Sequence, residues 1–397
     1  MLSWVCCGNG CRRIDSTDKI ASAVRYENPK GRSWFRKAIG KKIYIEPEAL
    51  TYLKSLNGYD QDKVIKGVEE LASIPHPSGG MVNTLRPNFF KAKTVHYFTL
   101  KYQVTSELVV VSDIDLNASM LSEKPKGKGE RGSLHRVQKV GNMQFTATSA
   151  LSDSKALQEQ TWSRRTATHD VQTEHAAVNG MLNELQKATW LMGVHAEHAY
   201  PEDKVSDYTL FHNPSEGGAL DFYESARDNM GLTTEVSRHL AAVLADVQRK
   251  GKPVKWVVHS QGGIIFKQAV KLHLKNYPGS SLDKNTVVFH AGGNNKKEAS
   301  RILTKAGIKR AAPDKDNPFD LVPNLAGRNH MDLASIKRSV SFWTKVKGTP
   351  DASPVESPHT LPFISLEAYH RFLTLAGDER SAAKVKKHMQ TMQGQGH

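Results

Sequence analysis

Apolar residues change their spacing along the chain, and this spacing predicts two differently built regions. From residue 205 onward, short apolar runs alternate with segments in which apolar residues recur every three to four positions. The first pattern predicts buried strands and the second predicts amphipathic helices. Alternation at these lengths predicts an α/β fold, with a mainly parallel sheet covered by helices on both faces. The expected elements are strands at 208–211, 254–258 and 287–290 and helices at 235–249 and 263–274.

A different pattern precedes this region and predicts a small α+β domain over residues 40–120. Helices are indicated where apolar residues share one face and prolines end the run, and strands where β-branched and aromatic residues gather. We expect a hairpin turn near Ser106 and Glu107. The expected elements are a strand at 42–45, helices at 46–56 and 60–73, and strands at 95–104 and 108–114.

Composition supplies the boundaries between these regions. The segment from Ser122 to Ser133 reads SEKPKGKGERGS and lacks large apolar residues, as is typical of a solvated linker. The residues that follow are polar, and Ala176 to Trp190 is their best helical stretch. We predict an N-terminal segment at 1–39, the small domain at 40–120, a linker at 121–150, a helical insert at 151–204, the α/β domain at 205–380 and a basic tail at 381–397.

Charge and hydropathy narrow the classes of partner and location. The 397 residues carry a formal net charge of +15, which favours phosphate-bearing partners, either nucleic acid or an anionic membrane surface. No apolar run approaches the roughly 20 residues needed to cross a bilayer. The N-terminus has no pattern of a standard signal peptide. We therefore expect a cytoplasmic protein in the producing cell, or one exported by a dedicated secretion machine.

Metal and disulfide chemistry find little support in the residue pattern. All three cysteines, Cys6, Cys7 and Cys11, lie at the N-terminus, so disulfides are not expected to hold the domains together. The run His195-Ala196-Glu197-His198 lacks the spacing of the zinc-protease helix, in which two histidines four apart flank a glutamate. We expect these histidines not to be ligands, and we expect no metal.

The sharpest chemical signal is the run Trp256-Val257-Val258-His259-Ser260-Gln261-Gly262-Gly263-Ile264-Ile265. It predicts a buried strand that ends at Val258, a tight turn that carries Ser260, and a helix that follows at once. Such a strand–turn–helix exposes a nucleophile beside a helix N-terminus, where backbone N–H groups stabilise an oxyanion. The usual pattern is Gly-x-Ser-x-Gly, and here Val258 stands where the first glycine is expected. The alternative is an ordinary turn in which Ser260 caps the helix.

A serine nucleophile needs a base and a carboxylate that orients the base. In folds of this kind the chain order is serine, then acid, then histidine. We predict Asp320 as the acid, with Asp316 and Asp332 as alternatives. For the base we predict His359, which lies in a proline-flanked loop; the alternatives are His330, His370 and His388.

The oxyanion donors are predicted from the turn and from the loop after residue 211. The Gln261 N–H is the first expected donor. The second is sought in Asn213 or Ser215, because Pro214 has no N–H.

These motifs resemble the α/β-hydrolase superfamily over roughly residues 205–375, and most closely its bacterial lipase-like members related to secreted antibacterial effectors. Within the resemblance, Tyr208 to Pro214 looks like the first core strand and oxyanion loop, and His259 to Gly263 looks like the nucleophile turn. The resemblance implies ester or lipid hydrolysis through an acyl-enzyme, without metal or organic cofactor. A lipase or phospholipase at anionic membranes is the expected function. An effector would also have an immunity or secretion partner protein.

Residues 40–117 resemble the RelE/ParE toxin fold, whose members cleave RNA or poison gyrase. The resemblance implies basic and tyrosine side chains on the sheet, and it makes an RNA-directed toxin the alternative function, with the hydrolase-like half as scaffold. A docking or delivery module is the other interpretation of this region. The side chains available are Arg86, Lys91, Lys93, His96, Tyr97, Lys101 and Tyr102.

Overall fold

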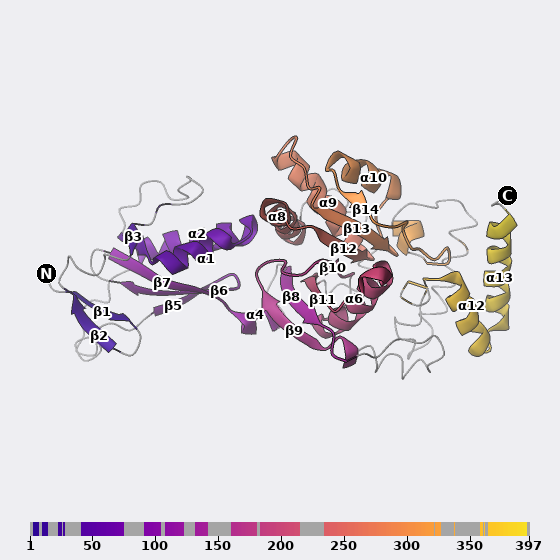
Figure 1. Ribbon diagram of the computed structural model, residues 1–397, viewed down its shortest axis with the longest axis horizontal. Coiled ribbons are helices and arrows are strands. Elements are labelled where there is room, and N and C mark those ends of the chain that lie inside the picture. Colours follow the sequence, from indigo (N-terminus) through magenta and orange to yellow (C-terminus); the bar gives the residue numbers. More distant parts are fainter. Residues whose placement is uncertain are drawn as a thin grey trace. The chain divides into compact units, whose positions relative to one another are not determined.

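The chain divides into two compact units, Met1–Glu123 and Lys124–His397, each of which is described by itself. The structure, a computed structural model, is drawn in Figure 1. It describes the chain apart from residues 1–2, 8–9, 15–22, 26, 28–40, 75–90, 105–107, 123–131, 142–159, 181–182, 215–233, 321, 327–336, 338–357, 360, 362–363 and 395–397.

The first unit is a five-stranded sheet with helices, as the sequence predicts for residues 40–120. Strands β6 and β7 pair antiparallel, which confirms the predicted hairpin strands, although the turn itself lies outside the described residues. The sequence missed β5, which pairs with β6. In sheet order the strands are β3 (Val24–Arg25), β4 (Lys42–Ile45), β7 (Leu108–Leu116), β6 (Phe98–Val104) and β5 (Lys91–Val95).

The described residues of this unit also form three helices and a 3-10 turn, and a hairpin precedes them. Helix α2 begins at Asn57, whose side chain accepts the N–H groups of Tyr59 and Asp60. The predicted helices at 46–56 and 60–73 are therefore confirmed. The elements are the antiparallel strands β1 (Ser3–Cys7) and β2 (Gly10–Ile14), helices α1 (Pro47–Ser55), α2 (Gly58–Glu70) and α4 (Ala118–Ser122), and the turn η1 (Leu71–Ser73).

The second unit is built on a seven-stranded mixed sheet. Strands β10, β11, β12, β13 and β14 run parallel, and β8 and β9 add an antiparallel edge. Parallel strands end at the same edge of a sheet, so the residues that follow β10, β11, β12 and β13 come together there. In sheet order the strands are β14 (Lys309–Arg310), β13 (Asn285–His290), β12 (Val254–His259), β10 (His175–Val178), β11 (Asp207–His212), β8 (Ser133–Gln138) and β9 (Arg164–Thr168).

Three of these strands correct the predicted domain boundaries. Strand β8 lies in the predicted linker, and β9 and β10 lie in the predicted helical insert. The expectation of a separate insert at 151–204 is therefore wrong, because these residues complete the sheet that continues with β11. Ala176 is in a strand, and the helix of this segment, α6 (Leu185–Ala199), begins later. The run Tyr208 to Phe211 is consequently a central strand and not the first one.

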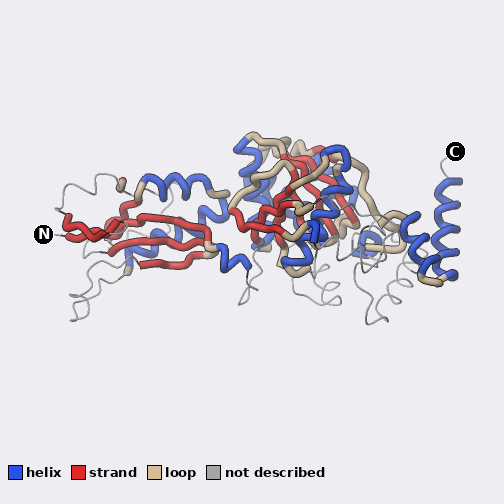
Figure 2. Tube along the Cα trace, turned by 60° about the horizontal axis from the view of Figure 1, so that its bottom comes forward, coloured by secondary structure: helices blue, strands red, loops and turns tan. Residues whose placement is uncertain are grey.

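Helices cover both faces of this sheet, as the tube of Figure 2 shows. Helix α8 begins at Thr234, whose side chain accepts the N–H of Ser237, and ends at Gly251 in the left-handed conformation. It contacts α9, and α9 contacts α10. The predicted helices at 235–249 and 263–274 are thus confirmed with slightly wider bounds. The covering helices are α6, α8 (Glu235–Lys250), α9 (Gln261–Asn276) and α10 (Lys296–Lys305).

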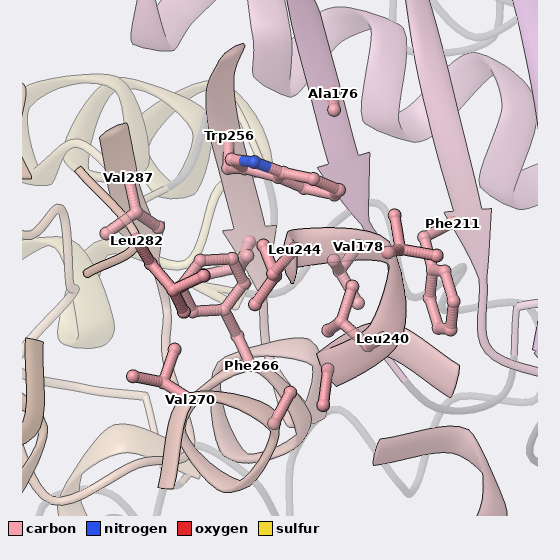
Figure 3. Packing of buried hydrophobic residues seen from close by; sticks show 14 of the residues in the cluster. Ala176, Val178, Phe211, Leu240, Leu244, Trp256, Phe266, Val270, Leu282 and Val287 are labelled. Carbon is pink, nitrogen blue, oxygen red and sulfur yellow. The ribbon is translucent and has the colours of Figure 1, made fainter. Parts of the chain in front are cut away.

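Alternate residues of β12 enter two separate apolar cores. Trp256 and Val258 pack with residues of α8 and α9, and Figure 3 shows this cluster around Trp256 and Phe266. Val257, which points to the other face, packs with residues of α6. Because side chains alternate along a strand, burial on both faces requires the stretch Trp256 to Val258 of β12 to be apolar. A strand fixed in this way is a rigid base for the residue that follows it.

The predicted basic tail at 381–397 is wrong as a frayed segment. It is mostly helix α13 (Glu379–Gly394), which follows α12 (Leu366–Leu375). Ala382 and Val385 of α13 are buried in a small cluster with Tyr369, Leu373 and Phe319. Among the described helices, none is long and apolar enough to cross a membrane.

Candidate active site

Ser260 occupies the corner between β12 and α9 and has a strained backbone. Its φ of 57° and ψ of −127° lie in a region that side chains other than glycine rarely adopt. Three hydrogen bonds hold the corner: Ser260 N donates to His290 O at 3.2 Å, and Ser260 O accepts from Gly263 N at 3.1 Å and Gly293 N at 3.0 Å. Strain that its surroundings hold in place is typical of catalytic residues. The predicted strand–turn–helix is confirmed.

Both predicted glycines after Ser260 fill positions where a side chain has no room. A Cβ on Gly262 would lie 2.6 Å from the carbonyl oxygen of Val178, and one on Gly263 would lie 2.4 Å from Asn294 Oδ1. The helix therefore approaches β10 and the loop after β13 closely. Val258, the departure from the usual motif, is fully buried in the core that faces α8 and α9.

The residue that faces Ser260 is Gly180, which the sequence did not indicate as part of the site. A Cβ on Gly180 would lie 2.5 Å from Ser260 Cβ and 2.9 Å from Ser260 Oγ. Gly180 follows β10, the strand that pairs directly with β12. The Asn179-Gly180 pair after a short apolar run is a turn signal that would have placed a strand end here.

An amide network joins the ends of β10 and β11 to the start of α9. Asn213 N donates to Asn179 Oδ1 at 2.7 Å, and Asn179 Nδ2 donates to Asn213 O at 2.9 Å. The Asn213 side chain donates to Gln261 Oε1 at 2.8 Å. The Asn213 N–H, predicted as an oxyanion donor, is thus engaged by Asn179, and Ser215 lies outside the described residues. Gln261 is the first residue of α9, where helix N–H groups have no partner within the helix.

The predicted acid and base form a pair. His359 Nδ1 lies 2.6 Å from Asp320 Oδ2, and Asp320 is 2% exposed. Val322 N donates to the other carboxylate oxygen at 3.0 Å, which fixes the orientation of the acid. Since a carboxylate accepts, His359 carries its proton on Nδ1, and Nε2 keeps a lone pair for use as a base.

The described alternatives to this pair make other contacts. Asp316 pairs with Lys296 at 2.5 Å, and burial, with a smaller contribution from Asp320, raises its pKa. His370 is in α12, and the His388 ring packs edge-on against Phe319. Asp332 and His330 lie outside the described residues.

The histidine loop is attached to the nucleophile corner through His259. His259 Nε2 lies 2.9 Å from the His359 carbonyl oxygen, and the two rings are 4.8 Å apart. His259 is the residue before Ser260, so this contact places the backbone of His359 beside the residue that precedes the nucleophile. Ser260 and His359 are 99 positions apart in the chain, and His259 links the segments that carry them.

The histidines of the run His195-Ala196-Glu197-His198 make separate contacts. His195 bonds His290, and His198 Nδ1 lies 2.9 Å from Val194 O. Within the described part of the chain, one group has potential metal ligands close together: Glu174, His175 and Asp203. There Lys255 Nζ contacts both carboxylates, at 2.9 Å and 2.6 Å. A lysine ammonium thus already supplies the positive charge, and we interpret the group as an ion-pair cluster.

The described side chains among those predicted for RNA binding are paired or at least half-buried within the first unit. Lys93 pairs with Glu70, and Lys101 pairs with Asp113 and Asp115, each at 2.7 Å. Arg86 lies outside the described residues. Tyr97, Tyr102 and the His96 side chain are buried, and Lys91 is half-buried. These contacts neutralise two of the charges that the RNA hypothesis requires.

A basic groove of about 510 Å³ lies between α9 and α10. It begins at Lys271, eleven residues after Ser260, which is about 16 Å along the helix at 1.5 Å per residue. It is therefore separate from the nucleophile corner. Its lining residues are Lys271, Leu274, Lys275, Glu298, Arg301, Ile302 and Lys305.

Comparison with known proteins does not assign the chain to a family. No protein-family model matches the chain, and no curated protein matches it.

Proposed function

We propose that this protein is a serine hydrolase that cleaves carboxylic esters through an acyl-enzyme. The observation that carries the proposal is the strained Ser260 corner, whose neighbour His259 holds the backbone of the Asp320-paired His359. Strain, a base with a fixed tautomer and a buried acid together are what an activated serine requires.

In the proposed reaction, Ser260 Oγ attacks the ester carbonyl carbon while His359 Nε2 takes the hydroxyl proton. Asp320 stabilises the imidazolium that forms. The Gln261 N–H and the N-terminal end of α9 stabilise the negative oxygen of the tetrahedral intermediate. When this intermediate collapses, the alcohol leaves with the proton from His359. Water then attacks the acyl-enzyme by the same route, with His359 again as base, and releases the acid.

The parallel strands and the chain order of the three residues support assignment to the α/β-hydrolase type. The serine follows a central parallel strand, and the acid and the histidine come later in the chain, as in that type. Val258 in place of the first glycine is the departure. The likeness of the first unit to RelE/ParE proteins stays part of the proposal, as a docking or delivery module.

The proposed substrate is a lipid or phospholipid ester at an anionic surface. The net charge of +15 and the basic groove between α9 and α10 support it, because both attract phosphate groups. Export as an antibacterial effector, with an immunity or secretion partner, is proposed from the resemblance to lipase-like effectors.

Replacement of Ser260 by alanine tests the reaction. We expect Ser260→Ala to lower kcat on a short-chain ester by at least about 10⁴-fold, because the attacking oxygen is removed. The exposed Ser281 is the matched control: Ser281→Ala should keep full activity. Full activity in Ser260→Ala would contradict the proposal.

A further inference from the structure

Three buried imidazoles that have no part in the proposed proton transfers lie in a row that leads to His359, the proposed base. It runs from His290 at the end of β13, through His195 of α6 and His259 at the end of β12, to His359. Successive ring centroids are 5.1, 4.4 and 4.8 Å apart. His195 and His290 are fully buried, and His259 is 2% exposed.

The contact between His259 and His359 defines the protonation state of His259. A carbonyl oxygen only accepts, so the 2.9 Å contact of His259 Nε2 with His359 O requires a proton on Nε2. Burial, together with the nearby His359, lowers the pKa of His259 to about 3. Its Nδ1 is buried and has no hydrogen-bond partner among the described residues. His259 is therefore a neutral donor with one defined tautomer near neutral pH.

The rest of the row holds the His259 ring in place. His195 Nδ1 and His290 Nδ1 are 2.8 Å apart, so one donates to the other. Burial lowers the pKa of both well below the usual value, which keeps the pair neutral. His290 also accepts the Ser260 N–H with its carbonyl oxygen. The His195 ring contacts His259, and His290 contacts the corner itself.

We infer that His259 is a positioning residue, which places the imidazole of His359 by holding its backbone carbonyl. The inference rests on the proposed function. Asp320 fixes the ring of His359 from one side, and His259 fixes the backbone of the same residue. Because His259 is bonded covalently to Ser260, this hydrogen bond ties the base directly to the nucleophile.

Two substitutions of His259 separate the hydrogen bond from the packing. His259→Phe keeps a ring of similar size and loses the donor, whereas His259→Gln places an amide N–H near the position of Nε2. We expect His259→Phe to lower kcat about 100-fold, with KM changed less than about twofold, since small misplacements of a catalytic group have effects of this size. We expect His259→Gln to restore at least about tenfold of the loss. An equal fall of kcat in both variants, or a rise in KM with kcat unchanged, would overturn the inference.

A spectroscopic measurement tests the same hydrogen bond without any turnover. In the full chain with ¹⁵N-labelled histidine, NMR should show His259 as a neutral imidazole with its proton on Nε2 from about pH 5 to about pH 8. In His259→Phe, the signal of the His359 Nδ1 proton should shift or broaden. A proton on Nδ1 of His259, or a charged ring near neutral pH, would overturn the inference. If the wild type showed these signals but did not hydrolyse esters, the result would count against the proposed function and not against the positioning role of the hydrogen bond.

Discussion

At the scale of single residues, the site depends on a contact that only glycine permits. Gly180 faces Ser260 so closely that a methyl group would meet both side-chain atoms of the serine. Ser260 cannot withdraw easily, since its φ of 57° is held by hydrogen bonds from the loop after β13 and the first turn of α9. The direction of the hydroxyl is therefore set partly by a residue 80 positions earlier.

Gly180→Ala should damage activity more than stability. The added Cβ would displace Ser260, and we expect kcat to fall about 100-fold and the free energy of unfolding to fall by about 1–3 kcal/mol. Ester turnover and chemical denaturation measure the two effects.

The control is Gly251→Ala, at a left-handed glycine with open space around it. It should cost about 1–2 kcal/mol of stability through backbone strain alone and leave kcat unchanged. If Gly180→Ala also left kcat unchanged, the close approach of Gly180 to Ser260 would not matter for activity.

The sequence predicted the residues whose signals are local. Ser260 stands in a recognisable strand–turn–helix, and Asp320 and His359 follow in the expected chain order. Gly180 and the partners His195 and His290 were missed, because their roles arise from which strand lies beside which. That arrangement depends on pairing between distant segments, which no local spacing records.

At the scale of elements, the two C-terminal helices support the acid loop. Phe319, the residue before Asp320, is buried in one cluster with Tyr369 of α12 and Val385 of α13. The helices thus fix the segment from which the acid reaches His359. Residues 381–397 were predicted to be a basic tail. Their few apolar residues bury only a narrow face of α13, so the sequence contains little sign of a packed helix.

Val385→Ser should loosen the acid loop and lower activity. Loss of buried apolar surface and burial of a hydroxyl should cost about 1–3 kcal/mol locally. We expect faster hydrogen exchange at the backbone N–H groups of Phe319, Asp320 and Val322 and a lower kcat, with the sheet strands unchanged. Lys384→Ser, at the exposed neighbouring position, should change neither quantity. Unchanged exchange in Val385→Ser would remove the supporting role of α13.

The strands that were mistaken for a linker and a helix are also explained at this scale. Strand β10 is four residues long and reads His-Ala-Ala-Val, in which two alanines favour a helix by propensity. All four residues are buried. Packing between β11 and β12 overrides the local preference, and this packing is not visible in the segment itself.

At the scale of the whole second unit, buried histidines make stability depend on pH. Burial is the first cause that lowers the pKa of each: to about 3 for His135 and His259, to about 4 for His212, and well below the usual value for His195 and His290. In the unfolded chain these residues titrate near pH 6.5. Between about pH 6.5 and these lower values, the unfolded state binds more protons than the folded state does. Stability is therefore full above about pH 6.5 and falls as the pH is lowered.

We expect each of these histidines to cost up to about 1.4 kcal/mol of unfolding free energy for each pH unit below about 6.5. Denaturation at several pH values, followed by the fluorescence of the buried Trp162, Trp190 and Trp256, measures the slope. His135→Gln should reduce the slope by one histidine's share. Stability that stayed flat down to about pH 5 would contradict the buried neutral state.

The activated serine is tested most directly by mapping the adduct of a fluorophosphonate probe on the full chain. We predict a single modified residue, Ser260, and labelling that is at least about 10³-fold slower in His359→Ala, because the hydroxyl loses its base. An adduct at another residue, no adduct in the wild type, or equal labelling in His359→Ala would contradict the account.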